Sequence, residues 1–333
     1  MRSLTVILSA AVLAVLGLCS GCGGRSQSVV QPDSVYVADV YRIMYEYGRT
    51  DSAGRDSLRM LDTAQVRAFM SVVGETPVTD LRMQGWSWSL PAIMFTPPVD
   101  SVFRSGSQPL AEALGIITAR MRAAGVELTP RSYGAVVWGR LESVMFVDSV
   151  MLVALNHYLG AEYPGYDHFP LYMRLVKEPE QMPYDVAEAM IATDHPYSNE
   201  GGTLLARMLY EGALTVAKME AVGDDGSDPA RALGYRPEQL QFILDNEKNL
   251  WQRLVADGLL YDTNTATVDR LIAPAPNSPL LDARCPGRVG RFFGYRIVRE
   301  YLRRNPEAAL PRLLSPDFYL NGPEVLAQSH YNP

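Results

Sequence analysis

The amino terminus constrains this chain most, because it sets the compartment in which the rest must fold. It begins MRSLTVILSAAVLAVLGLCSGCGGRSQS, with Arg2, an apolar run from Leu4 to Leu18, and then small residues and cysteines. This pattern predicts a secretory signal peptide, since the run is too short and wrongly flanked for a stable membrane span. Small residues directly before Cys22 also suit a lipoprotein signal peptidase. We therefore expect residues 1–21 to be removed and the Cys22 thiol to carry diacylglycerol.

Two alternatives to this cleavage stay open. Cys19 stands three positions before Cys22, where leucine is usual, but cleavage at Cys19 would leave bulky Leu18 directly before the modified cysteine. Cleavage by ordinary signal peptidase would instead give a secreted protein without a lipid. We favour Cys22, with palmitate among the acyl chains that hold the protein in the membrane. Residues 22–34, rich in Gly, Ser and Gln, then form a flexible tether.

No disulfide supports the mature fold if Cys22 is lipidated, because Cys285 is the only other cysteine after residue 21. Stability must come from an apolar core, which a chain of 333 residues that is 47% hydrophobic can build. The net charge of -7 without a basic cluster argues against nucleic-acid binding. The tether contains no acidic run, which favours an outer-membrane lipoprotein facing the periplasm.

The spacing of apolar residues predicts an α+β fold, predominantly helical with a small antiparallel sheet. Helical spacing marks residues 35–48, 62–75, 108–126, 182–196, 201–223, 236–258 and 288–306. Valine-rich runs predict strands at residues 133–139, 143–147 and 150–156. The proline-rich residues 89–101 are expected to interrupt the helices. No interior linker is polar and flexible enough to divide the chain, so residues 35–333 are expected to form a single domain.

The motifs of the common enzyme classes are missing from the sequence. No GxSxG, P-loop or GxGxxG motif follows a predicted strand. No HxxxH pair offers zinc two histidines one helical turn apart, and His157 and His168 merely flank one loop. Cys285 has no histidine near it in sequence and is expected to be an inert small residue. The motifs therefore predict no catalytic residue, metal site or cofactor.

Two other features have both a packing and a chemical interpretation. Glu188 and Glu211 lie on successive predicted helices and could face one another, although solvated glutamates are the ordinary expectation there. Gly290 and Gly294 lie on one face of a predicted helix, where a neighbouring element can approach the backbone closely. Since each glycine lowers helix propensity by about 1 kcal/mol, tight packing is the expected reason for the pair.

Several sequence blocks, in a fixed order, resemble the GldB-type gliding-motility lipoproteins of Bacteroidetes. The blocks are LNHYLGAEYPGY, LLARMLYEGALTVAKMEAV, LGYRPEQLQFILDNEKNLWQRLVADGLLYDT, IAPAPNSP, GRVGRFFGYRIVREYL and VLAQSHYNP. The resemblance extends from about residue 35 to the C-terminus and includes the lipoprotein signal. It implies a cell-envelope lipoprotein associated with gliding motility and without an established enzymatic activity.

That family in turn resembles zinc peptidases in which an HExxH helix precedes a helix with an EG pair. On this pattern Glu188 takes the place of the general base and Glu211 that of the third ligand. Ala187 and Ile191 stand where the two histidines belong, and neither can coordinate zinc. The resemblance thus implies a degenerate zincin-like scaffold without metal. The candidate cleft residues are His157, Glu188, Glu211, Tyr295 and Arg296.

The sequence therefore predicts a non-catalytic, lipid-anchored protein that binds envelope proteins or a peptide-like ligand in its cleft. The alternative is a metal-dependent peptidase with unconventional ligands. Those ligands would be His157, His168, Glu188 and Glu211, and they would have to converge within a few ångströms. A purely structural role in assembly is a third alternative.

Overall fold

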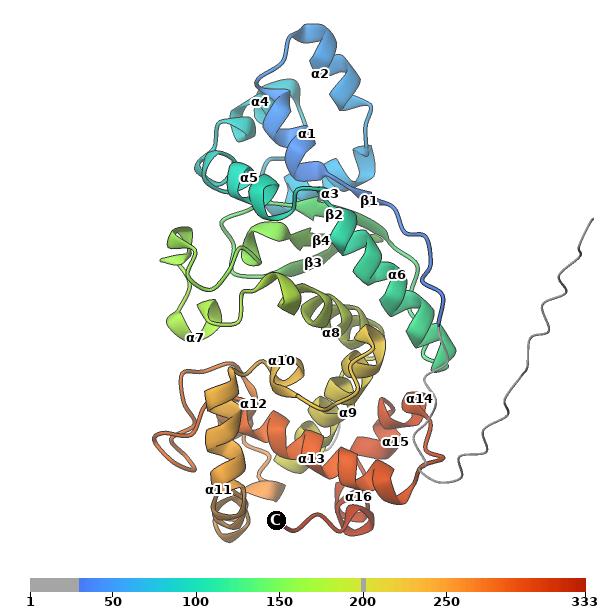
Figure 1. Ribbon diagram of the computed structural model, residues 1–333, viewed down its shortest axis with the longest axis vertical. Helices are drawn as coiled ribbons and strands as arrows, with labels where there is room; N and C mark the ends of the chain where they lie inside the picture. Colours follow the sequence, from blue (N-terminus) through green and yellow to red (C-terminus); the bar gives the residue numbers. More distant parts are fainter. Residues whose placement is uncertain (1–29, 199–201) are drawn as a thin grey trace, which may run out of the picture.

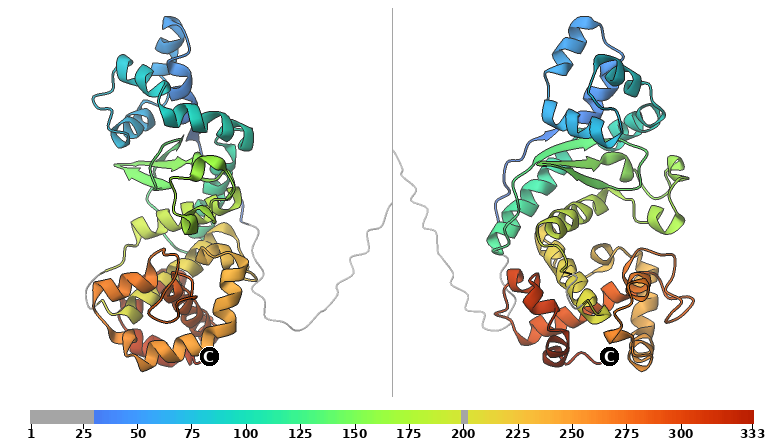
Figure 2. Two further views of the ribbon diagram at one scale, coloured as in Figure 1. Left: turned by 90° about the vertical axis from the view of Figure 1, so that its left-hand side faces the viewer. Right: turned by 180° about the vertical axis from the view of Figure 1, so that it is seen from behind.

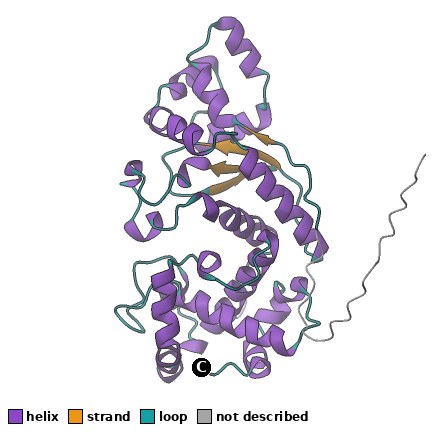
Figure 3. Cartoon of the chain, viewed as in Figure 1, coloured by secondary structure: helices purple, strands orange, loops and turns teal. Residues whose placement is uncertain are grey.

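The computed structural model describes residues 30–198 and 202–333, which form helices around one small sheet (Figure 1). Cys22 and most of the expected tether lie outside the described residues. Helices make up most of the structure, and Figure 3 shows the strands gathered in one place among them. The prediction of a mainly helical α+β fold is therefore confirmed.

The helices before the sheet cover the first third of the chain. They are α1 (Val40–Tyr47), α2 (Ser52–Arg59), α3 (Thr63–Val72), α4 (Asp80–Ser87), α5 (Leu90–Val102) and α6 (Gln108–Ala123). Predicted helices at residues 35–48, 62–75 and 108–126 correspond to α1, α3 and α6. Gly125, at φ 75°, follows α6 in the left-handed conformation that ends a helix.

The helices after the sheet make up the second half of the chain. They are α7 (Leu171–Arg174), α8 (Met182–Asp194), α9 (Leu204–Val222), α10 (Ala230–Leu233), α11 (Pro237–Ala256), α12 (Thr265–Ile272), α13 (Val289–Arg304), α14 (Leu310–Leu313), α15 (Pro316–Tyr319) and α16 (Gly322–Ser329). Short 3-10 helices are η1 (Leu155–His157), η2 (Pro164–Tyr166), η3 (Pro179–Gln181) and η4 (Leu259–Tyr261). The four long helices predicted in this half are α8, α9, α11 and α13.

The sheet is mixed, whereas the sequence predicted an antiparallel one. Its strands are β1 (Val37–Ala38), β2 (Ser132–Val136), β3 (Val144–Val147) and β4 (Val150–Ala154), in the order β1-β2-β4-β3. Only the β3–β4 hairpin is antiparallel, since β4 pairs in parallel with β2, and β2 with β1. The chain passes from β2 to the outer edge for β3 and returns in β4, whose five residues are all buried between two neighbours. A fully buried strand has no alternation, so its place could not be read from its pattern.

Helix α5 occupies residues that were expected to interrupt the helices. Pro91 lies in its first turn, where no N–H is needed, but Pro97 and Pro98 lie inside it. Pro98 cannot donate to the carbonyl of Met94, and the hydroxyl of Tyr163 donates to that carbonyl instead, at 3.1 Å. A side chain from a distant loop thus satisfies a group that the second proline leaves free.

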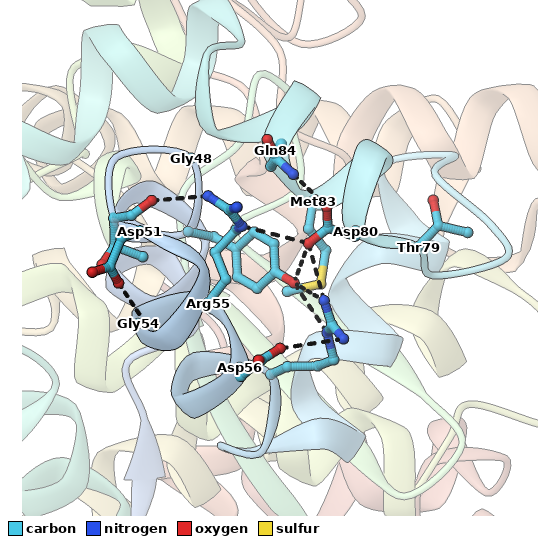
Figure 4. Close-up of polar contacts among 12 residues, drawn as sticks. Gly48, Asp51, Gly54, Arg55, Asp56, Thr79, Asp80, Met83 and Gln84 are labelled. Carbon is cyan, nitrogen blue, oxygen red and sulfur yellow. Dashed lines mark hydrogen bonds and ion pairs between the residues drawn. The ribbon is translucent and has the colours of Figure 1, made fainter.

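Helix α2 has no buried residue and is held by polar contacts (Figure 4). Asp80 of α4 accepts a hydrogen bond from the Tyr47 hydroxyl at 2.8 Å and from Arg59 at 3.0 Å. Arg55 of α2 lies 3.7 Å from the same carboxylate oxygen. Asp80 therefore joins α1, α2 and α4, and the apolar packing of α2 is limited to partly buried residues such as Leu58.

The layers of the structure follow the order of the chain, from the N-terminal helices through the sheet to the C-terminal helices. In both views of Figure 2 the sheet lies between helices α1–α5 and helix α8, and helices α9–α16 lie beyond α8. Buried apolar side chains form one cluster from Val37 to Tyr331. Within the described ranges, no helix is long and apolar enough to cross a membrane.

The backbones of α9 and α13 cross in direct contact at two glycines. A Cβ on Gly294 would lie 1.7 Å from the carbonyl oxygen of Met208, and one on Gly212 would lie 2.2 Å from the carbonyl carbon of Gly294. Gly290 faces α12, where a Cβ would lie 2.8 Å from a methyl carbon of Ile272. The prediction that neighbouring elements closely approach Gly290 and Gly294 is confirmed.

Replacing Gly294→Ala should therefore separate α9 from α13 and lower the free energy of unfolding by about 3 kcal/mol or more. Urea denaturation followed by circular dichroism measures this change. Gly85→Ala in α4 is the matched control, because nothing lies within 4 Å of its added Cβ. That control should be neutral or stabilising by about 0.5–1 kcal/mol. Equal stability of the two variants would contradict the close crossing.

Candidate functional site where helices α8, α9 and α13 meet

Helix α8 presents one apolar and one charged face. Its buried face consists of Met182, Val186, Ala187, Met190 and Ile191. Ala187 and Ile191, aligned with the two histidines of an HExxH helix, are thus fully buried core residues. Glu188 points away from this face, and its side chain is 26% exposed.

Helix α9 is nearly surrounded by other elements, and it carries charges into the interior. Thr203 caps its start by accepting a hydrogen bond from the N–H of Ala206, and Gly223, at φ 81°, follows its end. Glu211 and Lys218 both lie on this helix and are each 2% exposed. The expectation that Glu211 would be solvated was wrong, because the helix has almost no solvated face.

Ion pairs join the two glutamates through the first turn of α13. The Nη2 atom of Arg291 lies 2.9 Å from Oε1 of Glu188 and 2.7 Å from Oε2 of Glu211. Nη1 of the same guanidinium donates to Oε2 of Glu188 at 3.0 Å. Lys218 also donates to Glu188, and Arg207 pairs with Glu211 at 2.9 Å. We call these five residues, Arg207, Glu188, Glu211, Lys218 and Arg291, the ion-pair cluster.

Burial and charge act in opposite directions on the cluster. Burial opposes ionisation of Glu188, but Arg291 and Lys218 outweigh it and hold the pKa of Glu188 well below its usual range. Burial also opposes the charge on Arg291, yet the two glutamates raise its pKa further above the ordinary value. Glu188 and Arg291 are therefore both charged at neutral pH.

A second polar network adjoins the cluster at the start of β3. The Ser143 hydroxyl lies 3.0 Å from Nδ1 of His157 and accepts a hydrogen bond from Lys177 at 3.2 Å. Burial lowers the pKa of His157 well below its usual value, and the nearby ammonium of Lys177 adds to the effect. Asp185 of α8 accepts a hydrogen bond from Tyr158, and burial raises its pKa. The buried His157 thus belongs to this network.

The other predicted site residues lie elsewhere. Tyr295 is 4% exposed and packs in the core on α13. Arg296 turns to α11, where its Nε atom lies 2.8 Å from Glu247. His168 is exposed, and its ring is tilted against the ring of Phe169, which the ring of His157 meets edge to face. Of the predicted cleft residues, the structure brings together only Glu188 and Glu211.

The four ligands of the alternative metal site do not converge, since the two histidines share Phe169 while the two glutamates share Arg291. In the part of the chain that the structure describes, no group of three or more His, Cys, Asp or Glu residues is placed to hold a metal ion. Cys285 is also buried, and burial raises the pKa of its thiol to about 12.

The sequence analysis missed the cations of the cluster. A signal for them existed on α9, where Arg207, Glu211 and Lys218 recur at helical spacing on an otherwise apolar helix. Lys218 is also one of only three lysines in the chain. Arg291 gave no comparable signal, because its contact with α8 depends on how α13 crosses α9.

Comparison with protein families gives one match. A family model described as gliding motility protein GldB matches residues 127–333. The chain belongs to the GldB family. This membership places it among the gliding-motility lipoproteins of the cell envelope. The GldB match includes β2, β3, β4 and the whole ion-pair cluster. Comparison with curated proteins and with solved structures gave no match.

Replacing Glu188→Gln should lower the free energy of unfolding by about 3 kcal/mol at neutral pH, since Arg291 and Lys218 would lose a shared carboxylate. The pKa of Glu188 is depressed in the folded state. Its contribution is therefore complete above its ordinary pKa of 4.5 and is lost as pH falls below that value.

Urea denaturation of wild type and variant between about pH 7 and pH 3 measures this difference, which should shrink on acidification. Glu238→Gln is the control, because its exposed pair with Arg236 should contribute less than about 1 kcal/mol. A difference that stays constant with pH would show that Glu188 acts through its shape and not its charge.

Proposed function

We propose that this GldB-family protein is a lipid-anchored, non-catalytic binding protein of the outer membrane, facing the periplasm. In this proposal the exposed edge of β3, the adjoining part of α8 and the ion-pair cluster serve as its cleft, which binds an extended peptide segment of an envelope protein without cleaving it. Residues 35–333 act as one domain, with a degenerate zincin-like arrangement of α8 and α9.

The observation that carries this proposal is the place of Arg291. Its guanidinium bridges Glu188 and Glu211, the two residues that resemble a general base and a metal ligand. A divalent cation between these carboxylates would lie beside Arg291 and Lys218, and like charges at contact distance repel strongly in a buried site. The site is thus built to hold its own two cations, which favours binding over metal-assisted hydrolysis.

Strand β3 supports an extended peptide as the ligand. It is the edge of the sheet, and in its antiparallel pairing with β4 the backbone groups of Val144 and Phe146 point away from β4. No described residue forms a hydrogen bond with those backbone groups. All four residues of β3 are partly exposed, and the strand packs beside α8. An added strand would complete these bonds next to the ion-pair cluster.

Replacing Cys22→Ala in the full-length protein should release it from membranes, because no lipid would then be attached. Fractionation of cells into membrane and soluble protein measures the release. Cys285→Ala, at a buried cysteine, should leave the protein in the membrane fraction. Continued membrane association of the Cys22 variant would refute lipidation at that residue.

Peptide binding can be measured with a pool of random hexapeptides and full-length protein in detergent micelles. Retained peptides are quantified by mass spectrometry. The wild type should retain the pool, and Val144→Pro should reduce retention about tenfold, because proline removes an outward N–H that the fold itself does not use. Gly85→Ala, far from β3, should retain the pool as the wild type does. A pool methylated on alternate backbone nitrogens should not be retained.

Retention of the methylated pool would exclude strand addition, and no retention of any pool would refute peptide binding and favour a structural role. Cleaved peptides together with stoichiometric zinc, both lost in Glu211→Ala, would establish the metal-dependent peptidase instead.

A further inference from the structure

Arg288 directly precedes α13 in an uncommon backbone conformation. Its φ of 64° and ψ of 17° are left-handed, which is unfavourable by about 1–2 kcal/mol for a residue other than glycine. This conformation turns the side chain toward the end of α10. There, a Cβ on Gly234 would lie 1.9 Å from Nη1 of Arg288, so the guanidinium occupies space that only glycine leaves open.

The guanidinium of Arg288 has no partner among residues 30–198 and 202–333, with neither a hydrogen bond nor an ion pair. It is nevertheless only partly exposed. By contrast, Arg291, about one turn further along α13, forms ion pairs with Glu188 and Glu211. Burial lowers the pKa of Arg288, and the charge of Arg291 lowers it further. A partly buried guanidinium without an anion is unusual, since buried charges in proteins are normally paired.

Lys177 is a second cation without a carboxylate partner. It is 6% exposed, and among the residues that the structure describes its ammonium contacts the Ser143 hydroxyl and the face of Phe169, at 4.3 Å from the ring centre. Burial lowers the pKa of Lys177 to about 8. Lys177 and Arg288 both interact electrostatically with Asp185, whose oxygens accept hydrogen bonds from Gln181 and Tyr158.

Counted together, this region is positive. Five cations face three carboxylates here, and the wall of the adjoining pocket adds two arginines and three carboxylates, which leaves an excess of one positive charge in a protein whose net charge is -7. The cations are Arg207, Lys177, Lys218, Arg288 and Arg291, and the carboxylates are Asp185, Glu188 and Glu211. Such a local excess favours an anionic ligand.

A pocket of about 310 Å³ lies beside these groups. Tyr235 and Gln181 contribute to its wall, together with the charged residues Glu162, Glu178, Asp228, Arg231 and Arg236. The Tyr235 hydroxyl donates to the carbonyl of Gly287 at 2.9 Å, and Gln181 donates to Asp185 at 3.0 Å. Tyr235 thus connects the pocket wall to Gly287, the residue before Arg288, and the pocket volume suits the end of a short peptide.

We propose that Arg288 binds the C-terminal carboxylate of the peptide that occupies the cleft. This proposal rests on the proposed function and names the ligand more closely. A planar guanidinium holds a carboxylate through two parallel hydrogen bonds, and these are strongest in partly buried sites. A monoanion fits better than a phosphate dianion, because Asp185 and Glu188 repel a second negative charge.

Two pools of random hexapeptides, identical except for a free carboxylate or an amide at the C-terminus, test this proposal on full-length protein in detergent micelles. Wild type should retain the carboxylate pool at least about tenfold better than the amide pool. Arg288→Gln should retain both pools equally, at the level at which wild type retains the amide pool. Arg288→Lys should keep part of the preference, because lysine offers a charge without the planar pair of donors.

Arg284→Gln is the matched control, since Arg284 is an exposed arginine 3.4 Å from Asp282 and should leave the preference unchanged. The thermal unfolding midpoint of Arg288→Gln should equal or exceed that of wild type, because no ion pair is lost. A large decrease in that midpoint would make Arg288 a structural residue and overturn the proposal.

Equal retention of both pools by wild type, or an unchanged preference in Arg288→Gln, would overturn the carboxylate site while Val144-dependent retention still supports peptide binding. Retention of neither pool would refute both proposals. N-acetylglycine should compete with the carboxylate pool and inorganic phosphate at the same concentration should not. The reverse order would identify a phosphate site and exclude the carboxylate.

Discussion

The contact between α9 and α13 at Gly212 and Gly294 is the constraint on which the rest of the structure depends. Glu211 directly precedes the first of these glycines, and Arg291 lies about one turn before the second. Any side chain at the crossing would push the helices apart and take Arg291 out of reach of the carboxylate. The ion-pair cluster therefore requires the backbone contact, and α8 is joined to both helices through Glu188.

This arrangement pairs the two glutamates of an enzyme-like sequence pattern with cations of the same protein. Glu188 lies in the middle of α8, and Glu211 belongs to the EG pair of α9. Both carboxylates lie within reach of Arg291. The guanidinium of Arg291 occupies the position between the two carboxylates. Three helices are thus bound to one another by charges that a metallopeptidase would direct at a metal ion.

The long helices were predictable because each contributes a wide apolar face and ends at a glycine or proline signal. Gly290 and Gly294 also indicated close packing from sequence alone. The order of the strands was not predictable, because β4 is buried on both faces and inserts between β2 and β3, so that consecutive strands β2 and β3 do not pair. Glu188 and Glu211 were found by resemblance, but Arg291 was not, since it lies 80 residues beyond Glu211 and meets it only through the crossing. Pro97 and Pro98 led to the wrong prediction that no helix forms at residues 89–101. The carbonyl of Met94 that Pro98 leaves without a donor is satisfied by the hydroxyl of Tyr163, which is distant in sequence.

The GldB match begins at residue 127, so strands β2, β3 and β4 and the cluster belong to the matched region, and β1 and helices α1–α6 precede it. Within that preceding region, α2 differs from every long helix in what holds it. Asp80 and Arg59 are 44% and 51% exposed, so their attraction is screened by ions over about 10 Å at 0.1 M salt. Apolar burial responds to salt in the opposite direction or hardly at all. Raising the ionic strength is therefore expected to weaken the contacts of α2 with its neighbours while the apolar core keeps its strength, so α2 should be more sensitive to salt than the helices of the core.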